Sequence, residues 1–244
     1  MNQKVCAIMQ PTYMPWIGYF KLIDLVDKFI FLDTVQLNKR SFQTRNKIKN
    51  NDEELYLSIP IKKRSRANSL IKDIEIDGEK WIKKHVNSLK HSYNKSKYFD
   101  EIFYFIEFIL NKKHKNLSDL NCDIIIEISK NLGIETEFLK ASSLNENNLS
   151  REHKLIKICR DIKVNNYISP LNSSIYIEKN SVNAFKQSNI NLKYFEYYPC
   201  EYKQLGKVNI KYLSILDLLF NHGFKNSLEI LNQATFKLDF YENF

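Results

Sequence analysis

The stretch that most constrains the fold is residues 5–33, where the hydrophobic pattern changes its period twice. Residues 5–9 are apolar and partly β-branched, which predicts a buried strand. Two prolines then force an extended turn, and from Trp16 onward apolar side chains recur three or four positions apart, as on one face of a helix. Residues 29–33 form a second apolar run that ends in a carboxylate, Asp33. Strand, turn, helix and strand in this order predict a βαβ unit with parallel strands.

Strand and helix patterns alternate at both ends of the chain, whereas the middle shows helical patterns alone. Because such alternation is typical of parallel sheets covered by helices, the sequence predicts an α/β fold with a mainly parallel, Rossmann-like sheet. We expect one domain over residues 1–244, with a helical insertion over residues 77–132. The last strong helix is expected to begin at Ser214 and to end at Gly223, with a short helix behind it. Further strands are expected at 55–60, 71–76, 136–141, 167–169 and 192–198.

The charge and the cysteine content limit the class of protein. The formal net charge of +9 is compatible with nucleic-acid binding, but the abundance of Asn, Lys and Ile favours AT-rich coding as its source. The four cysteines form no C-x-x-C pair, and no secretion signal precedes the first strand. The most apolar run, residues 102–110, is shorter than the roughly 20 residues of a membrane span. We therefore expect a soluble cytoplasmic protein without a membrane span.

Several common cofactor and catalytic motifs are absent from the sequence. The five glycines are scattered, so neither G-x-x-x-x-G-K-[ST] nor G-x-G-x-x-G occurs. The G-x-S-x-G elbow of α/β-hydrolases is missing, and the five histidines show no metal-ligand spacing, so we expect no metal. A bound phosphate would have to contact cationic side chains, amides of the proline-containing turn, or the helix start near Trp16.

Polar and aromatic side chains follow the first two predicted strands at the point where each strand ends. Ligands of parallel sheets bind beyond the carboxyl ends of the strands, so these side chains form the candidate site. Arginine suits a diphosphate and aromatic rings suit a base or a sugar, so the pattern favours a nucleotide-linked sugar. The alternative is that the rings pack in the core and the cations are solvated. The set consists of Gln10, Tyr13, Trp16, Tyr19, Asp33, Gln36, Lys39, Arg40, Gln43, Arg45, Asn46 and Lys47.

Four segments, spread in order over most of the chain, form one combined pattern. They are Q-P-x-Y-x-P-W-x-G-Y-F from Gln10, continued by D-x-x-Q from Asp33 and K-R-S-x-x-x-R-N from Lys39, and then residues 56–60, 167–177 and 213–221. This pattern resembles the signature of the WbqC-like family, which is associated with bacterial O-antigen and other surface-polysaccharide gene clusters. The resemblance implies a place in polysaccharide assembly more firmly than it implies a reaction.

Two further groups of residues join the candidate site. Ser214 and Asp217 lie in the last segment of the resemblance. Ser-x-x-Asp at the start of an apolar helix is also a capping box, in which each side chain satisfies a backbone N–H, and this structural interpretation is the favoured one. Ser169, Ser174 and Tyr176 follow a predicted strand at the ligand-bearing edge, where a serine-rich turn is the alternative.

We interpret the chain as a protein that acts on a nucleotide-linked amino sugar during O-antigen or other surface-polysaccharide assembly. The preferred reaction is transfer of an acyl or aminoacyl group to the sugar amine, which needs a base for the amine proton and cations for the diphosphate. The expected roles are a base at Asp33, further catalytic groups at Gln10 and Tyr19, stacking at Trp16 and Tyr19, phosphate contacts at Arg40, Arg45 and Lys47, and substrate binding by the rest of the set.

Two other functions stay open at this point. The first alternative is a non-catalytic nucleotide-sugar-binding or scaffold protein of the same pathway, and the second is a nucleic-acid-binding module. The sequence identifies neither the acyl donor nor any cofactor. It also leaves the oligomeric state open, with a homodimer as one option.

Replacing Arg45 by Lys separates phosphate binding from simple charge. If the guanidinium grips a diphosphate, Arg45→Lys weakens nucleotide-sugar binding at least about tenfold, because a point charge cannot supply two parallel hydrogen bonds. The melting temperature is expected to stay near that of the wild type. Titrations of both proteins with one panel of nucleotide sugars, at two salt concentrations, measure the effect. Equal affinities would mean that this arginine binds no phosphate.

Overall fold

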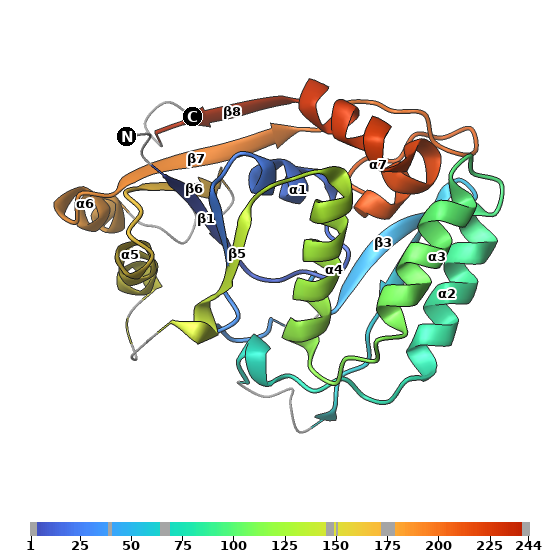
Figure 1. The fold of residues 1–244 in the computed structure, drawn as a ribbon, viewed down its shortest axis with the longest axis horizontal. Helices are drawn as coiled ribbons and strands as arrows, with labels where there is room; N and C mark the ends of the chain where they lie inside the picture. The colour runs from blue at the N-terminus through green and yellow to red at the C-terminus, as the bar shows by residue number, and fades with distance from the viewer. Residues whose placement is uncertain are drawn as a thin grey trace.

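A six-stranded sheet runs through the structure, a computed structural model that describes residues 4–38, 41–63, 69–144, 149, 151–171 and 179–240 (Figure 1). In spatial order its strands are β5 (Glu137–Lys140), β2 (Lys28–Phe31), β1 (Val5–Met9), β6 (Asn166–Pro170), β7 (Asn191–Tyr198) and β8 (Thr235–Asp239). Neighbouring strands are parallel except for the last pair, because β8 runs antiparallel to β7. The predicted Rossmann-like α/β fold is thus confirmed.

The order in which the chain fills this sheet defines one position for a ligand. Counted along the chain, the six strands lie in the order 3-2-1-4-5-6, which is that of dinucleotide-binding folds. The chain builds outward from β1 through β2 to β5 and then returns to the other side of β1 to form β6. Ligands of such sheets bind beyond the carboxyl ends of the strands where this reversal occurs. In this chain the reversal, which we call the switch point, lies between β1 and β6.

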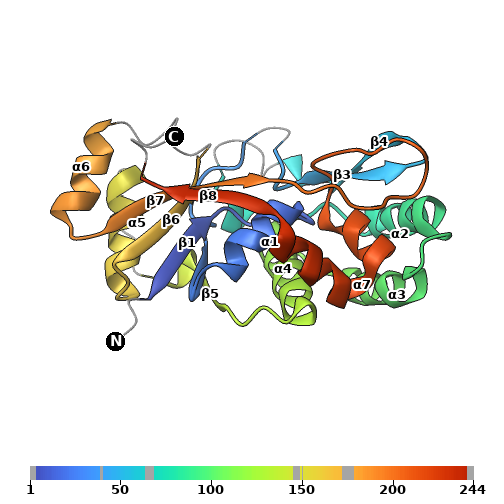
Figure 2. The same cartoon turned by 90° about the horizontal axis from the view of Figure 1, so that it is seen from above.

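Seven helices accompany the sheet in the described part of the chain. They are α1 (Ile17–Asp24), α2 (Lys80–Tyr93), α3 (Phe99–Leu110), α4 (Leu117–Leu132), α5 (Arg151–Asp161), α6 (Lys179–Gln187) and α7 (Ile215–Gln233). Successive side chains of a strand point to opposite faces, so on β1 Ala7 packs in a large cluster with α1, α4 and α7, whereas Cys6 and Ile8 pack in a smaller one with α5 and α6. Both views place α5 and α6 at one end of the molecule and α2 and α3 at the other (Figures 1 and 2).

The segment after β2 confirms one predicted strand and corrects another. Residues 55–60 do contain a strand, but β4 (Glu53–Ser58) pairs with β3 (Arg45–Asn50) in a separate hairpin and not in the main sheet. The strand predicted at 71–76 is wrong, because a 3₁₀ turn at Ile71–Asp73 is followed only by isolated bridges. There the N–H of Ile71 donates to Val35 and that of Ile76 to Lys115, so the hydrogen bonds go to several segments and no ladder forms.

The three helices α2, α3 and α4 follow one another between β4 and β5, over the range predicted as a helical insertion. Helices α3 and α4 pack against α7, α3 also packs against α2 and α4, and α2 contacts β3. The division of the chain into one domain with an inserted segment stays a prediction.

Helix α7 changes direction at the glycine that the sequence predicts as its end. Gly223 has φ +70° and ψ 176°, a conformation that is open essentially only to glycine, and the helix resumes behind it. A Cβ atom at this position would lie 2.7 Å from the Tyr98 ring. The kink therefore depends on the absence of a side chain.

Replacing Gly223 by Ala is expected to destabilise the fold by more than the same change at Gly133. The backbone conformation alone costs about 1–3 kcal/mol for a non-glycine residue, and the contact with Tyr98 adds to it. Gly133 ends α4 in the left-handed region, and an added Cβ atom there would meet nothing within 4 Å, so Gly133→Ala costs about 1–2 kcal/mol. Urea denaturation of both variants measures the difference. A loss at Gly223 no larger than that at Gly133 would contradict this account of the kink.

Candidate functional site

Three predicted site residues meet at the carboxyl end of β1, next to the switch point. Gln10 directly follows β1, and its backbone carbonyl accepts a hydrogen bond from the Tyr19 hydroxyl at 3.0 Å. Its side-chain oxygen accepts a hydrogen bond from Nε2 of Gln43. Ser169, near the end of β6, is completely buried on the other side of the switch point. The structure thus brings Gln10, Tyr19 and Gln43 together.

Two amide oxygens at this place are buried without a hydrogen-bond partner among the described residues. They are Oε1 of Gln43, whose side chain is 6% exposed, and Oδ1 of Asn121 on α4. Nδ2 of Asn121 donates to the carbonyls of Pro11 and Gln43, at 3.1 and 2.9 Å, which fixes Asn121 beside the turn. Buried acceptors in this state are costly unless something donates to them. We call Gln43 Oε1 and Asn121 Oδ1 the acceptor pair.

Asp33, the predicted base, lies at the end of β2 with both carboxylate oxygens occupied. Oδ1 accepts a hydrogen bond from the backbone N–H of Ser142 at 2.9 Å, and Oδ2 accepts from the Ser142 hydroxyl at 2.7 Å. A third bond, at 3.3 Å, comes from the hydroxyl of Ser118 on α4. Asp33 itself is buried, but Ser142 is exposed. Any proton that reaches this carboxylate from outside therefore has a route through the Ser142 hydroxyl.

Tyr13 is a core residue and not part of an open site. Its hydroxyl lies 2.9 Å from Nδ1 of His85 on α2, and Nε2 of His85 lies 3.2 Å from the carbonyl of Ser58. A carbonyl only accepts, so Nε2 carries the hydrogen and Nδ1 accepts from the tyrosine. Burial lowers the pKa of His85 to about 4, against the weaker opposing effect of the Ser58 hydrogen bond. The imidazole is therefore neutral at pH 7.

The described residues of the predicted basic run that follow Thr44 lie on strand β3 of the hairpin. The Arg45 guanidinium lies 4.8 Å from the centre of the Tyr56 ring, and Nζ of Lys47 lies 2.5 Å from Glu54. Asn46 is buried and donates to the carbonyls of Tyr13 and Met14. Gln36 is exposed and forms a bridge with Leu70. The predicted site residues Lys39, Arg40, Ser174 and Tyr176 lie outside the described residues.

The predicted capping box at the start of α7 is half right. Oγ of Ser214 accepts from the backbone N–H of Leu216 at 3.3 Å, as an N-cap does. The Asp217 side chain does not accept the reciprocal backbone hydrogen bond that a capping box requires. Its two oxygens accept from the hydroxyls of Tyr93 and Tyr202, each at 2.9 Å, because α2 and the loop before α7 cover this helix start. Burial raises the pKa of Asp217 to about 6, although both tyrosine hydrogen bonds act in the opposite direction.

Residues 199–213 form a loop between β7 and α7. Besides Asp217, a second carboxylate accepts hydrogen bonds from this loop. Asp52, in the tight turn between β3 and β4, accepts from the backbone N–H groups of Lys207 and Val208 at 2.9 and 3.0 Å. These bonds lower the pKa of Asp52. The Lys49 ammonium, whose side chain is 2% exposed, donates to the carbonyl of Val208 and lies 3.3 Å from Asp52. The loop is therefore fastened to the hairpin as well as to Asp217.

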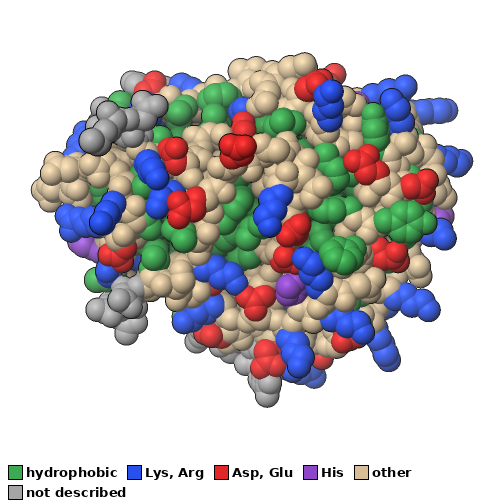
Figure 3. Space-filling model, in the orientation of Figure 1, with side chains coloured by type: hydrophobic (Ala, Val, Ile, Leu, Met, Phe, Trp, Pro, Cys, Tyr) green, Lys and Arg blue, Asp and Glu red, His purple; other side chains and the backbone are tan. Residues whose placement is uncertain are grey.

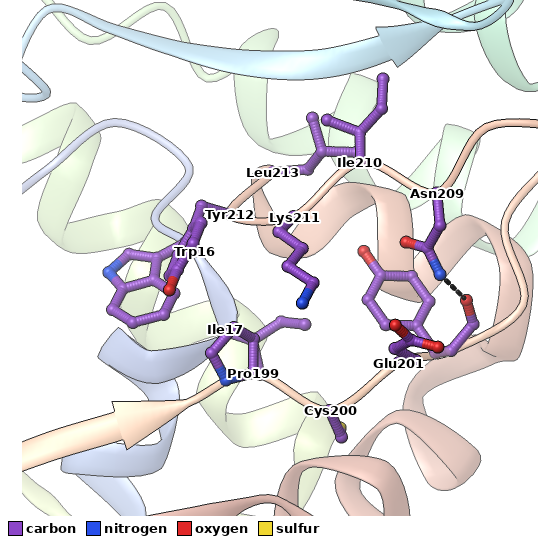
Figure 4. A pocket seen from close by; sticks show the side chains of 11 residues that line it. Trp16, Ile17, Pro199, Cys200, Glu201, Asn209, Ile210, Lys211, Tyr212 and Leu213 are labelled. Carbon is purple, nitrogen blue, oxygen red and sulfur yellow. Dashed lines mark hydrogen bonds between the residues drawn. The ribbon is translucent and has the colours of Figure 1, made fainter.

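A small pocket lies between this loop and the start of α1 (Figure 4). Of the predicted site residues only Trp16 lines it, with Pro199, Glu201, Asn209, Lys211 and Tyr212 among the others. Its cavity volume is about 10 Å³, roughly the room that one water molecule needs. The side chain of Lys211 extends across the hollow toward Ile17 and Pro199 (Figure 4). An open groove of about 420 Å³ between α5 and α6 contains none of the predicted site residues.

The sequence carried weak signals for the residues that were missed. Asn121 is a polar residue on the apolar face of the helix that also bears Ile124, Ile125 and Ile128, and a buried amide in such a place needs an explanation. The aromatic residues of loop 199–213 had no such signal, because their positions depend on the hairpin and on α7. A polar residue inside an apolar stripe is thus the more useful clue.

The described ranges contain neither a group of side chains that could hold a metal ion nor a helix that could span a membrane. No group of three or more His, Cys, Asp or Glu side chains there lies close enough together to hold a metal ion. No described helix is both long and apolar enough to cross a membrane. On the described part of the face in Figure 3, basic and acidic side chains are interspersed, so this face offers no continuous basic stripe for a nucleic-acid backbone.

Comparison with known proteins gives a family and a relative. The model of the WbqC-like protein family matches residues 10–229. A protein of Mycobacterium tuberculosis (strain ATCC 25618 / H37Rv), named "Uncharacterized protein Rv1507c", is 33% identical over 222 residues, which cover 90% of this chain and 94% of the relative. No solved structure matches.

Asp217→Asn is expected to change how stability depends on pH. The folded-state pKa of Asp217, about 6, lies above the ordinary value of 3.8, so the folded protein holds this proton more tightly than the unfolded chain does. The contribution of Asp217 to stability therefore falls as pH rises through that window, by about 1–2 kcal/mol between pH 5 and pH 7.5. Asparagine does not titrate. Urea denaturation of wild type and variant at these two pH values measures the difference.

His85 acts with the opposite sign in the same range. Its folded-state pKa lies below the ordinary value of 6.5, so its contribution to stability is lost as pH falls below that value. The two groups offset each other in the wild type, and Asp217→Asn leaves the loss caused by His85 unopposed. The variant should therefore lose more stability than the wild type on going from pH 7.5 to pH 5. Parallel profiles would show that Asp217 is already ionised at pH 5.

Proposed function

The chain belongs to the WbqC-like protein family, and from that membership we propose that it acts on a nucleotide-linked amino sugar in bacterial surface-polysaccharide assembly. The proposed reaction is transfer of an acyl or aminoacyl group to the sugar amine. The observation that supports it most is the acceptor pair, Gln43 Oε1 and Asn121 Oδ1, buried beside the switch point of a Rossmann-ordered sheet without a partner among the described residues.

The chemistry of the acceptor pair suits an amine. An amino group brings two or three N–H donors, and amide oxygens accept them without adding charge. A carboxylate in the same place would stabilise the ammonium form and raise its pKa, whereas uncharged oxygens leave more of the amine neutral and nucleophilic. The nitrogen then attacks the acyl carbon, the carbon–leaving-group bond breaks, and the nitrogen gives up one proton.

Asp33 and Ser142 are the groups we propose for that proton. The Ser142 hydroxyl is exposed and donates to Oδ2 of Asp33 at 2.7 Å, so it can accept a proton from the amine while passing its own to the carboxylate. Ser118 also donates to Asp33, and it lies one turn before Asn121 on the same side of α4. Helix α4 therefore carries both a residue that contacts the proposed relay and a member of the acceptor pair.

Arg45 and Lys47 are the proposed contacts for the diphosphate. The Arg45 guanidinium lies over the Tyr56 ring, 4.8 Å from the ring centre, and its planar fork of N–H groups suits two parallel bonds to a phosphate. The residue follows Gln43 by two positions, so a ligand whose amine meets the acceptor pair can extend toward the hairpin. No glycine-rich loop is needed in this arrangement, which agrees with the absence of one from the sequence.

A non-catalytic nucleotide-sugar-binding protein is the second candidate. It is favoured by one observation, namely that every oxygen of Asp33 already accepts a hydrogen bond from a serine. The two candidates differ in turnover. Binding of amino-sugar nucleotides without product formation from acyl-coenzyme A or aminoacyl donors would support the second.

Gln43→Leu is expected to remove the preference for an amine. Wild-type protein should bind UDP-glucosamine more tightly than UDP-glucose, which carries a hydroxyl in place of the amine. Leucine has a similar size but no acceptor, so the variant should lose roughly tenfold in affinity for the amine ligand, as for one hydrogen bond at the upper end of the neutral range. Calorimetric titration of both ligands measures the ratio.

The matched control is Gln233→Leu, at an exposed position near the end of α7. It should leave both affinities near the wild-type values. The proposal fails if the wild type does not distinguish the two ligands, or if Gln43→Leu and Gln233→Leu distinguish them equally well.

A further inference from the structure

Tyr212, at the rim of the pocket in Figure 4, has a backbone conformation that its size disfavours. Its φ angle is +59°, in the left-handed region, and its side chain is 54% exposed. A bulky residue in this region is an outlier, and such strain is concentrated at ligand-binding and active sites. Glycine would adopt this conformation without strain, and burial does not explain why a tyrosine stands here. We therefore attribute the choice of tyrosine to its exposed ring.

Trp16 forms the wall beside it and is held in place from behind. A Cβ atom on Gly18 would lie 2.4–2.8 Å from three atoms of the Trp16 ring, so the ring lies directly against the first turn of α1. The ring of Tyr197 meets Trp16 edge-on at 5.4 Å. Tyr212 lies at 5.4 Å from Trp16 with the two planes tilted by 55°. The two rings therefore form a pre-organised aromatic corner.

The rest of the pocket wall combines apolar side chains with a few polar ones. Lys211 extends into the hollow, and Glu201 and Asn209 lie on its far side, where the Asn209 amide donates to the carbonyl of Tyr202 (Figure 4). They supply an amide, an ammonium and a carboxylate, which between them donate to and accept from hydroxyl groups. A volume of about 10 Å³ does not enclose a ligand, so a ligand would lie on the rings and touch the polar groups at its edge.

We propose that this pocket binds a pyranose ring. The first candidate is the sugar of the nucleotide-linked substrate, and this assignment of the sugar rests on the proposed function. A pyranose has an apolar face of C–H bonds, which suits an aromatic ring, and hydroxyls around its rim, which suit the polar groups here. A planar base would instead fit a slot between parallel rings. The tilt of 55° between Trp16 and Tyr212 provides no such slot. The stacking surface is thus Trp16 with Tyr212, since Tyr19 is buried.

Saturation-transfer NMR with methyl α-D-glucopyranoside and methyl α-D-glucosaminide tests this inference without any nucleotide. Wild-type protein should transfer saturation to the C–H protons of the ring. Tyr212→Gly should reduce the transfer at least fivefold and keep or raise the melting temperature, because glycine relieves the strain at φ +59°. Tyr212→Phe keeps the ring and should keep most of the signal. Tyr104→Ala, which removes a 64% exposed ring from α3, is the control and should match the wild type.

The inference is overturned if the wild type gives no transfer, or if Tyr212→Gly transfers as strongly as Tyr104→Ala. It is also overturned if uridine diphosphate, tested in the same way, gives transfer to its base that Tyr212→Gly removes, because the ring would then bind the base. Its failure is distinct from that of the proposed function. If saturation is transferred to the glycosides but the protein shows no preference for UDP-glucosamine over UDP-glucose, the sugar-binding pocket stands and the proposed amine site fails.

Discussion

The turn after β1 is held by two asparagine side chains, and the rest of the candidate site depends on their hydrogen bonds. Asn46 from the hairpin donates to the carbonyls of Tyr13 and Met14, and Asn121 from α4 donates to those of Pro11 and Gln43. Buried carbonyls without donors would destabilise this turn. The two asparagines satisfy them from outside the turn, which is why a loop with two prolines and no glycine before Gly18 can lie in the protein interior.

This arrangement replaces the phosphate loop of other folds with the same strand order. In dinucleotide-binding folds glycines let a pyrophosphate approach the first turn closely. Here the turn has no glycine and contains the fully buried Tyr13, and the start of α1 is covered by the segment before α7, since Trp16 bridges to Ser214 and the N–H of Ile215 donates to Pro15. The turn therefore offers side-chain acceptors where those folds offer backbone amides. That difference favours an amine over a phosphate at this point of the sheet.

The sequence predicted the parts of the structure that local patterns determine. The βαβ unit, the strands near 136–141, 167–169 and 192–198 and the interruption of the last helix at Gly223 follow from hydrophobic period and from glycine, and the structure confirms them. The hairpin partner β3 was missed because Arg45–Asn50 is strongly polar and is stabilised by contacts with α2 and α7. Asp217 was assigned to capping because its two tyrosine partners come from residues 93 and 202, far away in sequence. The edge of the sheet could be predicted, whereas the partners of each side chain there could not.

A crystal structure of the protein with UDP-glucosamine bound tests the central claim most directly, because it locates the amine. The account predicts the sugar nitrogen within about 3 Å of Gln43 Oε1 or Asn121 Oδ1, at the carboxyl end of β1. A ligand bound instead in the groove between α5 and α6, or one whose amine points into solvent while the acceptor pair contacts only water, would contradict it.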